Sequence, residues 1–363
     1  GDGQAARRAA KRAGRRGNAP GTAPGRGDRQ AARRAGEGGT MTNQPLVELH
    51  LHLEGAAPPA FIRGLAAGKG LRLPDIFDSS GAYAFADFAA FLEVYEAATS
   101  VLTTPDDYRR LVAEVLGALA AEGVIYAETF VSPDFCGGGD VGAWRDYLAA
   151  MDEAADAAPG VELRWIVTCI RHFGPEQARR VARCAAETAG GRLVGFGMAG
   201  AETVGAARDY AWAFDCAREA GLRLTAHAGE WKGPEEVRAA LRDLRVERIG
   251  HGVRAIEDPA LVETLAEAGT VLEVCPGSNI ALGLYPDWAS HPVARLRAAG
   301  VRVTVSTDDP PFFHTGMRHE MTRLQETFGW EASDIAALAR TAAEAAFCDA
   351  DTRARLLERL GAS

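Results

Sequence analysis

The sequence lacks several features that mark whole classes of protein. No apolar run approaches the ~20 residues that a membrane-spanning helix needs, so we expect no membrane association. No two cysteines are spaced as Cys-x-x-Cys, and no segment has the apolar core of a secretory signal. We therefore expect a cytoplasmic protein whose cysteines are reduced core residues: Cys136, Cys169, Cys184, Cys216, Cys275 and Cys348.

The first forty residues lack valine, isoleucine, leucine, methionine and every aromatic residue. They carry ten Lys+Arg against three Asp+Glu. Because such a segment buries too little apolar surface to fold, we predict that residues 1–40 are a disordered basic leader or an upstream extension ahead of Met41. Residues 41–363 then form one domain. The alternative is a basic arm that binds nucleic acid, which salt-dependent binding with and without residues 1–40 would test.

The rest of the chain is acidic. Residues 41–363 hold 30 Lys+Arg against 46 Asp+Glu, which gives them a formal net charge of −16. A surface of this sign repels a phosphate backbone, so we expect no nucleic-acid partner for the folded part. A small-molecule substrate is the partner that this composition favours, and nothing in the sequence indicates an oligomeric state.

Short apolar runs of strand type alternate along the chain with longer segments of helical periodicity. Strict alternation of eight strands with helices predicts a (β/α)8 TIM barrel rather than an open sheet. A helical insertion, residues 56–104, follows the first strand, and closing helices follow Pro310. We expect most aromatic residues of the insertion to form its own core rather than a lid. The strand candidates are residues 46–52, 124–131, 162–170, 193–200, 222–229, 246–252, 270–276 and 301–307.

Two histidines on the first strand candidate indicate a metal site. Side chains alternate faces along a strand, so His50 and His52 point the same way. His227 and Asp308 lie where the fifth and eighth strands end, and the ends of barrel strands converge on one mouth. Three imidazoles and one carboxylate are ligands that zinc prefers, and they leave a position for a water that the metal activates.

Two more titratable residues fall at the same strand ends. Glu230 follows His227 by three positions and is the natural carrier of a proton to a substrate nitrogen, although it could instead cap the helix that begins near Pro234. His251 lies between two glycines and could orient or deprotonate the water, or act as a fourth imidazole ligand. The fourth strand carries no lysine that could bridge two ions when carboxylated, so we expect one zinc per chain.

The segments HLHLEG, GMAGAE, HAGE, RIGHG, LEVCPGSN and STDDP, in this order, resemble the adenosine deaminase family of the amidohydrolase superfamily. The resemblance covers Leu46 to about Phe347. It implies that His50, His52, His227 and Asp308 are the zinc ligands, that Glu230 protonates the purine nitrogen N1, and that His251 orients the water. It also implies that the Gly200 amide meets purine N3 and that the Asp309 carboxyl bonds N7.

The residue Glu54 bears on which 6-aminopurine is the substrate and does not decide it. Family members that act on adenosine typically have Asp where this chain has Glu54, and the Asp reaches toward the ribose. The resemblance therefore implies hydrolytic deamination of a 6-aminopurine, with adenosine or 2′-deoxyadenosine as the main expectation and aminodeoxyfutalosine or adenine as alternatives. We expect Glu54 to contact the substrate. Phe135, His172, Phe173 and Trp231 are candidates for the far part of the pocket. A non-catalytic binding protein on the same fold is the alternative from another class.

Overall fold

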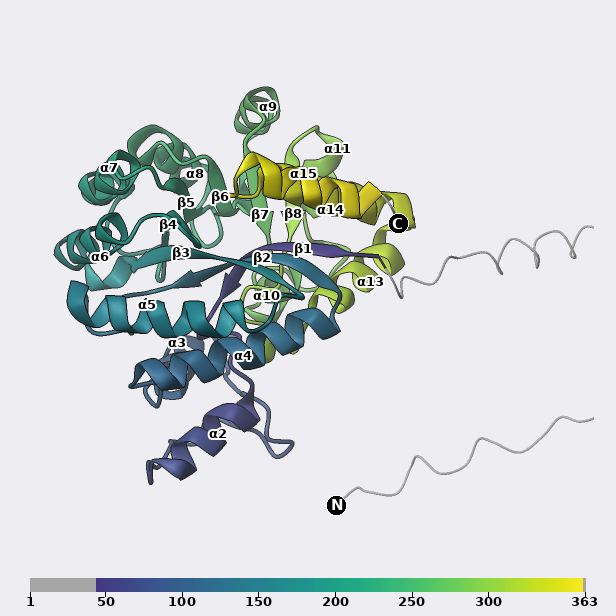
Figure 1. The fold of residues 1–363 in the computed structure, drawn as a ribbon. Coiled ribbons are helices and arrows are strands. Elements are labelled where there is room, and N and C mark those ends of the chain that lie inside the picture. The colour runs from purple at the N-terminus through teal and green to yellow at the C-terminus, as the bar shows by residue number, and fades with distance from the viewer. Residues whose placement is uncertain (1–43, 362–363) are drawn as a thin grey trace, which may run out of the picture. The chain divides into compact units, whose positions relative to one another are not determined.

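The computed structural model describes residues 44–361, in which eight parallel strands form a barrel with helices between them (Figure 1). The strands are hydrogen-bonded in sequence order, β1 to β8. This confirms the predicted (β/α)8 barrel, and the prediction for residues 1–40 lies outside the described residues. The strands are β1 Leu46–His52, β2 Val124–Val131, β3 Glu162–Ile170, β4 Leu193–Ala199, β5 Arg223–Ala228, β6 Arg248–His251, β7 Val271–Val274 and β8 Arg302–Val305.

The barrel closes where β8 meets β1. The Asp308 amide donates to the His50 carbonyl at 3.0 Å, and the His52 amide donates to the Asp308 carbonyl at 2.9 Å. The Ser306 hydroxyl adds a bond at the same seam, because it accepts from the His50 amide at 3.2 Å. The closing seam thus runs through three of the residues that the sequence assigns to the metal.

Helices begin and end at the residues that favour each terminus. Thr104 and Asp107 form a reciprocal capping box at the start of α4, and Gly269 ends α9 in a left-handed conformation. The α-helices are α2 Pro59–Gly68, α3 Phe88–Thr99, α4 Pro105–Ala121, α5 Val141–Asp156, α6 Pro175–Glu187, α7 Ala211–Glu219, α8 Pro234–Ala239, α9 Pro259–Ala268, α10 Pro276–Ala281, α11 Val293–Ala298, α12 Pro310–Phe313, α13 Met317–Phe328, α14 Ala332–Ala345 and α15 Ala350–Gly361. Three short 3-10 helices are η1 Arg171–Phe173, η2 Ala207–Tyr210 and η4 Val253–Glu257, and η3 Ala240–Leu244 is a short π-helix that continues α8.

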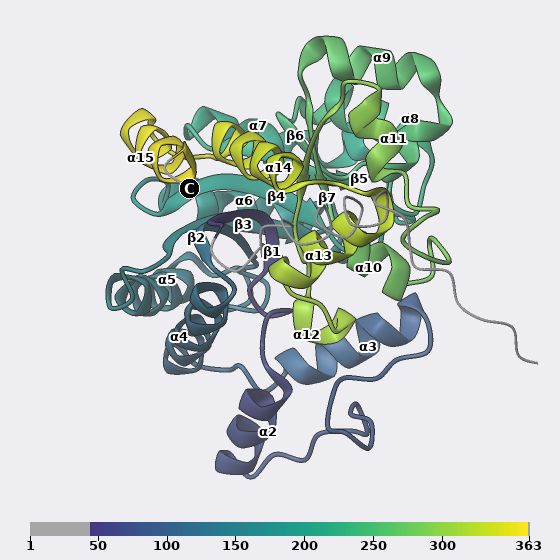
Figure 2. The same ribbon diagram turned by 90° about the vertical axis from the view of Figure 1, so that its right-hand side faces the viewer.

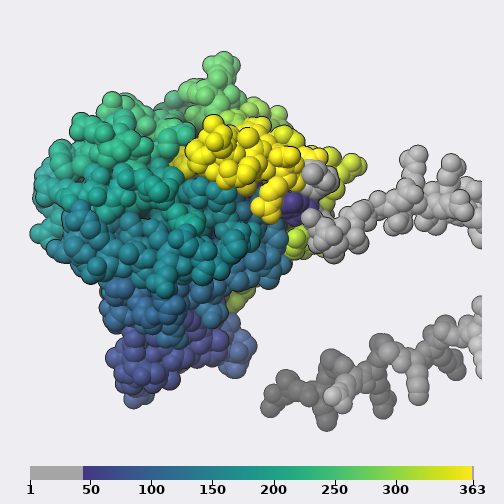
Figure 3. Space-filling model, in the orientation of Figure 1, coloured from purple at the N-terminus to yellow at the C-terminus, as the bar shows by residue number. Residues whose placement is uncertain are grey.

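The last two helices pack against the first strands. Buried alanines of α14 and leucines of α15 share a cluster with Val47 and Leu49 of β1 and with Ile125 and Tyr126 of β2. The outer side of α15 lies at the surface, where it is yellow in Figure 3. These helices are the closing pair that the sequence predicts.

The insertion after β1 places α3 beside α12 (Figure 2). Phe91 of α3 meets the rings of Phe312 and Phe313, with centroids 5.7 and 5.2 Å apart. Tyr83 stacks on Phe312 at 3.9 Å, and both side chains are fully buried. Loss of a buried phenylalanine ring typically costs about 3–5 kcal/mol, so this cluster fixes α3 firmly against the barrel. The aromatic residues of the insertion thus pack on α12 as well as on one another, and Phe88, Phe91 and Tyr95 also line a pocket, so they are not only the insertion's own core as predicted.

All six cysteines are free, and four of them are buried. Cys136, Cys169, Cys184 and Cys275 are therefore core residues as predicted, whereas Cys216 and Cys348 are only partly buried. In the part of the chain that the structure describes, none of the helices combines the length and the apolar character that crossing a bilayer demands.

Candidate active site

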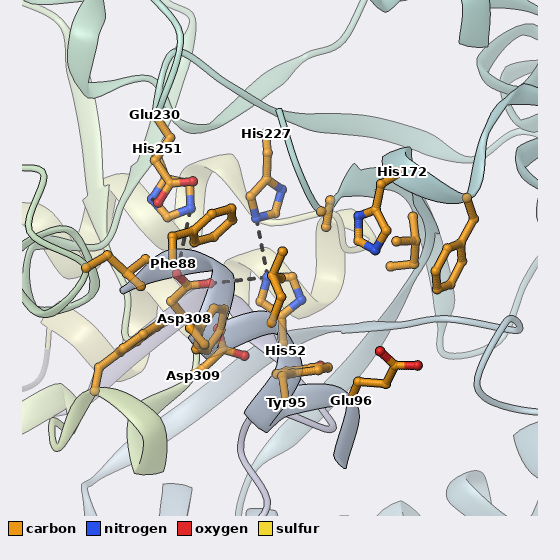
Figure 4. A pocket seen from close by; sticks show the side chains of 18 of the residues that line it. His52, Phe88, Tyr95, Glu96, His172, His227, Glu230, His251, Asp308 and Asp309 are labelled. Carbon is orange, nitrogen blue, oxygen red and sulfur yellow. Dashed lines mark hydrogen bonds and ion pairs between the residues drawn. The ribbon is translucent and has the colours of Figure 1, made fainter. Parts of the chain in front are cut away.

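Four predicted metal ligands converge at the carboxyl ends of the strands. The ligand atoms of His50, His52, His227 and Asp308 all lie within 4.8 Å of one another. The His227 Nε2 atom is 3.0 Å from His50 Nε2 and 3.3 Å from His52 Nε2. Asp308 Oδ1 lies 3.2 Å from His52 Nε2 (Figure 4). Residues from three different strand ends therefore point their donor atoms at one place.

The groups behind two of these histidines orient them for a cation. His50 Nδ1 is 2.8 Å from a Glu273 carboxylate oxygen, and His227 Nδ1 is 2.9 Å from the Met198 carbonyl. A ring that donates from Nδ1 presents the lone pair of Nε2, which is the form that binds a metal. Three imidazoles, two of them with oriented lone pairs, beside a buried carboxylate thus fit a divalent cation.

The backbone is left-handed at two of the site residues. His251 has φ of 57° and Asp308 has φ of 67°. Such conformations are unfavourable for residues other than glycine and are common at functional sites. At Asp308 the two seam bonds to β1 hold the backbone in this conformation, and the carboxylate thereby faces the histidines.

Glu230 and His251 lie next to the cluster and next to each other. His251 Nδ1 is 3.8 Å from Glu230 Oε1, and its Nε2 is 3.7 Å from Asp308 Oδ2. Burial, with the neighbouring Asp308 and Glu202 carboxylates, raises the pKa of Glu230 well above its usual range. Glu230 can therefore hold a proton at neutral pH. The helix-cap alternative is wrong, because α8 is capped at Gly233 without any side-chain bond.

A pocket opens over the cluster, and most of the predicted substrate residues line it. Gly200, Asp309, Phe135, His172 and Phe173 are all in its wall. The α3 helix forms the opposite side with Phe88, Phe91, Leu92, Tyr95 and Glu96 (Figure 4). Burial and the adjacent Asp308 carboxylate raise the pKa of Asp309 well above its usual range. The Oδ1 atom of Asp309 is buried without a hydrogen-bond partner among the described residues and lies against Gly55, where a Cβ would be 1.6 Å away.

Two predicted pocket residues lie elsewhere. Glu54 is buried, does not line the pocket, and accepts a hydrogen bond from the Tyr108 hydroxyl of α4 at 3.1 Å. The predicted contact of Glu54 with substrate therefore has no support in this geometry, because the turn after β1 directs the side chain toward α4. Burial raises its pKa to about 7. Trp231 packs on Phe88 with ring centroids 4.5 Å apart and is likewise outside the pocket wall.

Four residues of the site carry no role in the sequence interpretation. Ser278 donates to Asp308 Oδ2 at 2.7 Å, and Asn279 contacts both Glu230 and His251. His291 contacts Asn279, and Glu202 accepts from the backbone around Glu230. Ser278, Asn279 and Glu202 lie in the segments LEVCPGSN and GMAGAE, so their position at strand ends could have marked them as site residues. His291 lies in a loop, and nothing in the sequence marks it as a site residue.

The chain is similar to one protein family and to several curated proteins over most of its length. A family model described as adenosine deaminase matches residues 45–363. An adenine deaminase of Rhizobium leguminosarum bv. trifolii (strain WSM2304) is 50% identical over 318 residues, covering 86% of this chain and 98% of the relative. One from Chelativorans sp. (strain BNC1) is 49% identical over 315 residues, covering 86% and 97%.

Solved structures are similar over the same part of the chain. The crystal structure of an adenine deaminase from Arthrobacter aurescens has a TM-score of 0.81 and 30% identity, covering 88% of this chain and 98% of that one. An amidohydrolase from Burkholderia ambifaria, solved with bound Zn, has a TM-score of 0.76 and 28% identity, covering 88% and 93%.

Proposed function

This chain belongs to the adenosine deaminase family, and from that premise we propose that it hydrolyses free adenine to hypoxanthine and ammonia. The predicted enzyme class is confirmed: the chain is a hydrolytic deaminase that acts on a carbon–nitrogen bond. The observation that carries the choice of adenine is the 50% identity, over 86% of the chain, to a protein named adenine deaminase. Adenosine, the main expectation from the sequence, has less support than this alternative.

We assign His50, His52, His227 and Asp308 to one zinc ion per chain. The support is the donor set itself, with ligand atoms within 4.8 Å of one another, and the bound Zn of a structural relative. Zinc held in such a site acts as a Lewis acid that makes water nucleophilic at neutral pH.

Glu230 supplies the acid of the reaction. Its raised pKa keeps a proton on the carboxyl until an adenine ring nitrogen, N1, lies beside it. Protonation of N1 makes C6 more electrophilic, so that water adds there and the amino group leaves as ammonia. Burial of Glu230 at 7% exposure excludes the bulk water that would otherwise take up the proton.

Two residues would hold the purine ring. A protonated Asp309 donates a hydrogen bond to N7, which only accepts. Gly200, with φ of 93°, brings its backbone amide to N3, and a Cβ at this position would lie 2.7 Å from His172 Nδ1. Glycine is thus required both by the backbone conformation and by the close approach of His172.

The test is a comparison of kcat/KM for adenine, adenosine and aminodeoxyfutalosine, measured by the change in purine absorbance and by ammonia release. We expect adenine to have the highest value by at least about tenfold, which corresponds to 1.4 kcal/mol of transition-state stabilisation. A higher kcat/KM for either of the other two would reject adenine as the substrate and leave the deaminase chemistry intact. Elemental analysis of the same preparation gives the identity and number of metal ions per chain.

A further inference from the structure

Asn279, in α10 directly after β7, contacts both residues that handle protons. Its Nδ2 atom is 3.3 Å from Glu230 Oε1 and 3.2 Å from His251 Nδ1. Its Oδ1 atom is 3.2 Å from His291 Nε2. The side chain is fully buried, and these are its three polar side-chain contacts among residues 44–361.

The direction of every hydrogen bond in this group follows from one backbone amide. The Val293 N–H donates to His291 Nδ1 at 3.2 Å. A nitrogen that accepts carries no proton, so the His291 ring has its proton on Nε2. That Nε2–H can only donate, and the atom of Asn279 that receives it must be the amide oxygen.

The amide orientation then determines the state of His251. With Oδ1 facing His291, the two N–H bonds of Asn279 point at Glu230 Oε1 and at His251 Nδ1. Both are donors, so His251 Nδ1 accepts and is unprotonated. The proton of this ring is therefore on Nε2, the atom 3.7 Å from Asp308 Oδ2.

We propose that Asn279, oriented by His291, is a positioning residue that fixes the tautomer of His251 and decides which carboxyl oxygen of Glu230 carries the acid proton. His251 presents an N–H to the reacting water and orients it. It neither removes a proton from that water nor ligates the metal through Nε2. On Glu230, the oxygen that accepts from Asn279 is the poorer place for a proton, so Oε2 donates to the substrate. The assignment of His251 stands on geometry, whereas the role of Glu230 rests on the proposed function.

The opposite amide orientation is strongly disfavoured. It would set two donors, the His291 Nε2–H and the Asn279 amide group, against each other. This buried mismatch leaves polar groups unsatisfied at about 1–3 kcal/mol. The contact with His291 thus fixes the orientation of Asn279, and His251 follows it.

The first experiment needs no substrate. The full-length chain is prepared with 15N in the histidine rings, and His251 is assigned by the signal that is lost in His251→Gln. We expect the two-bond 1H–15N spectrum to show His251 with Nδ1 unprotonated and Nε2 protonated. A protonated Nδ1 on His251 in the unsubstituted protein would overturn the proposal.

Variants then separate positioning from simple packing. Asn279→Asp keeps the shape of the side chain but replaces both donors with acceptors, so we expect the His251 proton to move to Nδ1. With it we expect kcat to fall on the order of 10–100-fold, with a nearly unchanged KM and an unchanged metal content. His291→Gln retains a donor at the position of Nε2 and should keep kcat within about threefold, whereas His291→Phe should lose at least about tenfold.

The matched control is His319→Gln, which removes an exposed histidine of α13 outside this group. It should remove only its own signal and leave the His251 signals and kcat unchanged. If Asn279→Asp does not fold, the spectrum of the unsubstituted chain and the two His291 variants still test whether Asn279 fixes the His251 tautomer. An unchanged His251 tautomer in His291→Phe together with full activity would also overturn the proposal. The spectrum is recorded without substrate, so it tests the His251 tautomer even if adenine is not the substrate. The proposal for Asn279 and the proposal of adenine as substrate can therefore fail independently.

Discussion

At the scale of single residues, Glu230 combines burial with two neighbouring carboxylates, and this combination makes it an acid. Glu230→Gln preserves the hydrogen bond from Asn279 but has no proton to transfer. We expect kcat to fall by about 10²–10⁴-fold, because general acid catalysis contributes this much. Metal content should be unchanged, since Glu230 is not in the donor set. Elemental analysis measures the metal content, and the change in purine absorbance measures kcat. Substantial turnover in the variant would disprove the acid role.

The control for this variant is Glu235→Gln. Glu235 is an exposed carboxylate in the first turn of α8, five positions along the chain, and should show unaltered kcat and KM. A loss of activity in this control would mean that changes near α8 act through the fold rather than through proton transfer.

Asp309 offers a second test, because its raised pKa makes it a donor instead of an acceptor. Asp309→Asn keeps an N–H that can donate to the purine, so we expect KM to change by no more than about threefold. Asp309→Ala removes the donor and should raise KM about tenfold, equivalent to about 1.4 kcal/mol. Steady-state kinetics at pH 7 compare the two. Equal KM values for both variants would show that no hydrogen bond is donated here.

At the scale of secondary-structure elements, Glu202 holds the turn that presents Glu230. Its carboxylate accepts four consecutive backbone N–H groups, those of residues 229 to 232. Glu202→Gln turns one accepting oxygen into a donor that faces these amides. We expect a loss of about 1.5–3 kcal/mol in the free energy of unfolding, as for other bonds to charged groups. Urea denaturation measures it, and a change below about 0.5 kcal/mol, the usual size for surface positions, would contradict this role.

Glu320 makes the junction between α13 and α10 sensitive to pH. It accepts from the Gly277 amide at 3.1 Å and from the Thr315 hydroxyl at 2.6 Å, and burial raises its pKa to about 8. The folded state therefore keeps a proton that the unfolded chain releases near pH 4.5. The stabilising contribution is complete below pH 4.5 and is lost as the pH rises toward 8.

Glu320→Gln mimics the protonated carboxyl at every pH. We expect the variant to gain stability relative to the unsubstituted chain between pH 5 and pH 8, by up to about 1.4 kcal/mol per pH unit. Urea midpoints at several pH values measure this difference. Parallel pH profiles for the two proteins would show that Glu320 does not titrate in this range.

The sequence predicted the elements well and the contacts between them poorly. The predicted strand 193–200 is observed as Leu193–Ala199, and 246–252 as Arg248–His251, because apolar periodicity reports burial directly. The sequence identified the four candidate metal ligands because barrel topology brings strand ends together. Asn279 and Glu202 were missed as site residues, since an amide or carboxylate gives no periodic signal of the atom it will contact. The direction of Glu54 depends on the turn after β1, which the strand pattern does not determine.

At the scale of the whole molecule, a metal bound by the four candidate ligands would link three segments that lie far apart in sequence. Removing it leaves three imidazoles and the Asp308 carboxylate without their common ligand. We expect chelation to lower the melting temperature and zinc to restore it, with about 2.7 kcal/mol of stabilisation when free metal is at 100 times its Kd. Differential scanning calorimetry with chelator and with added zinc measures the shift. His52→Ala should abolish the restoration, and an equal melting temperature with and without metal would refute the site.

The seam between β1 and β8 also bears on how the protein is made. Ser306, which bonds the His50 amide, lies 256 positions after it in the chain. A ribosome synthesises β1 first, and the first strand then has no partner on one side until β8 has emerged. Two histidines of the donor set are thus translated early, but their carboxylate partner is added only when the barrel can close. A chain that ends before Asp308 consequently lacks the full donor set, and the carboxylate joins the histidines only when the seam between β1 and β8 forms.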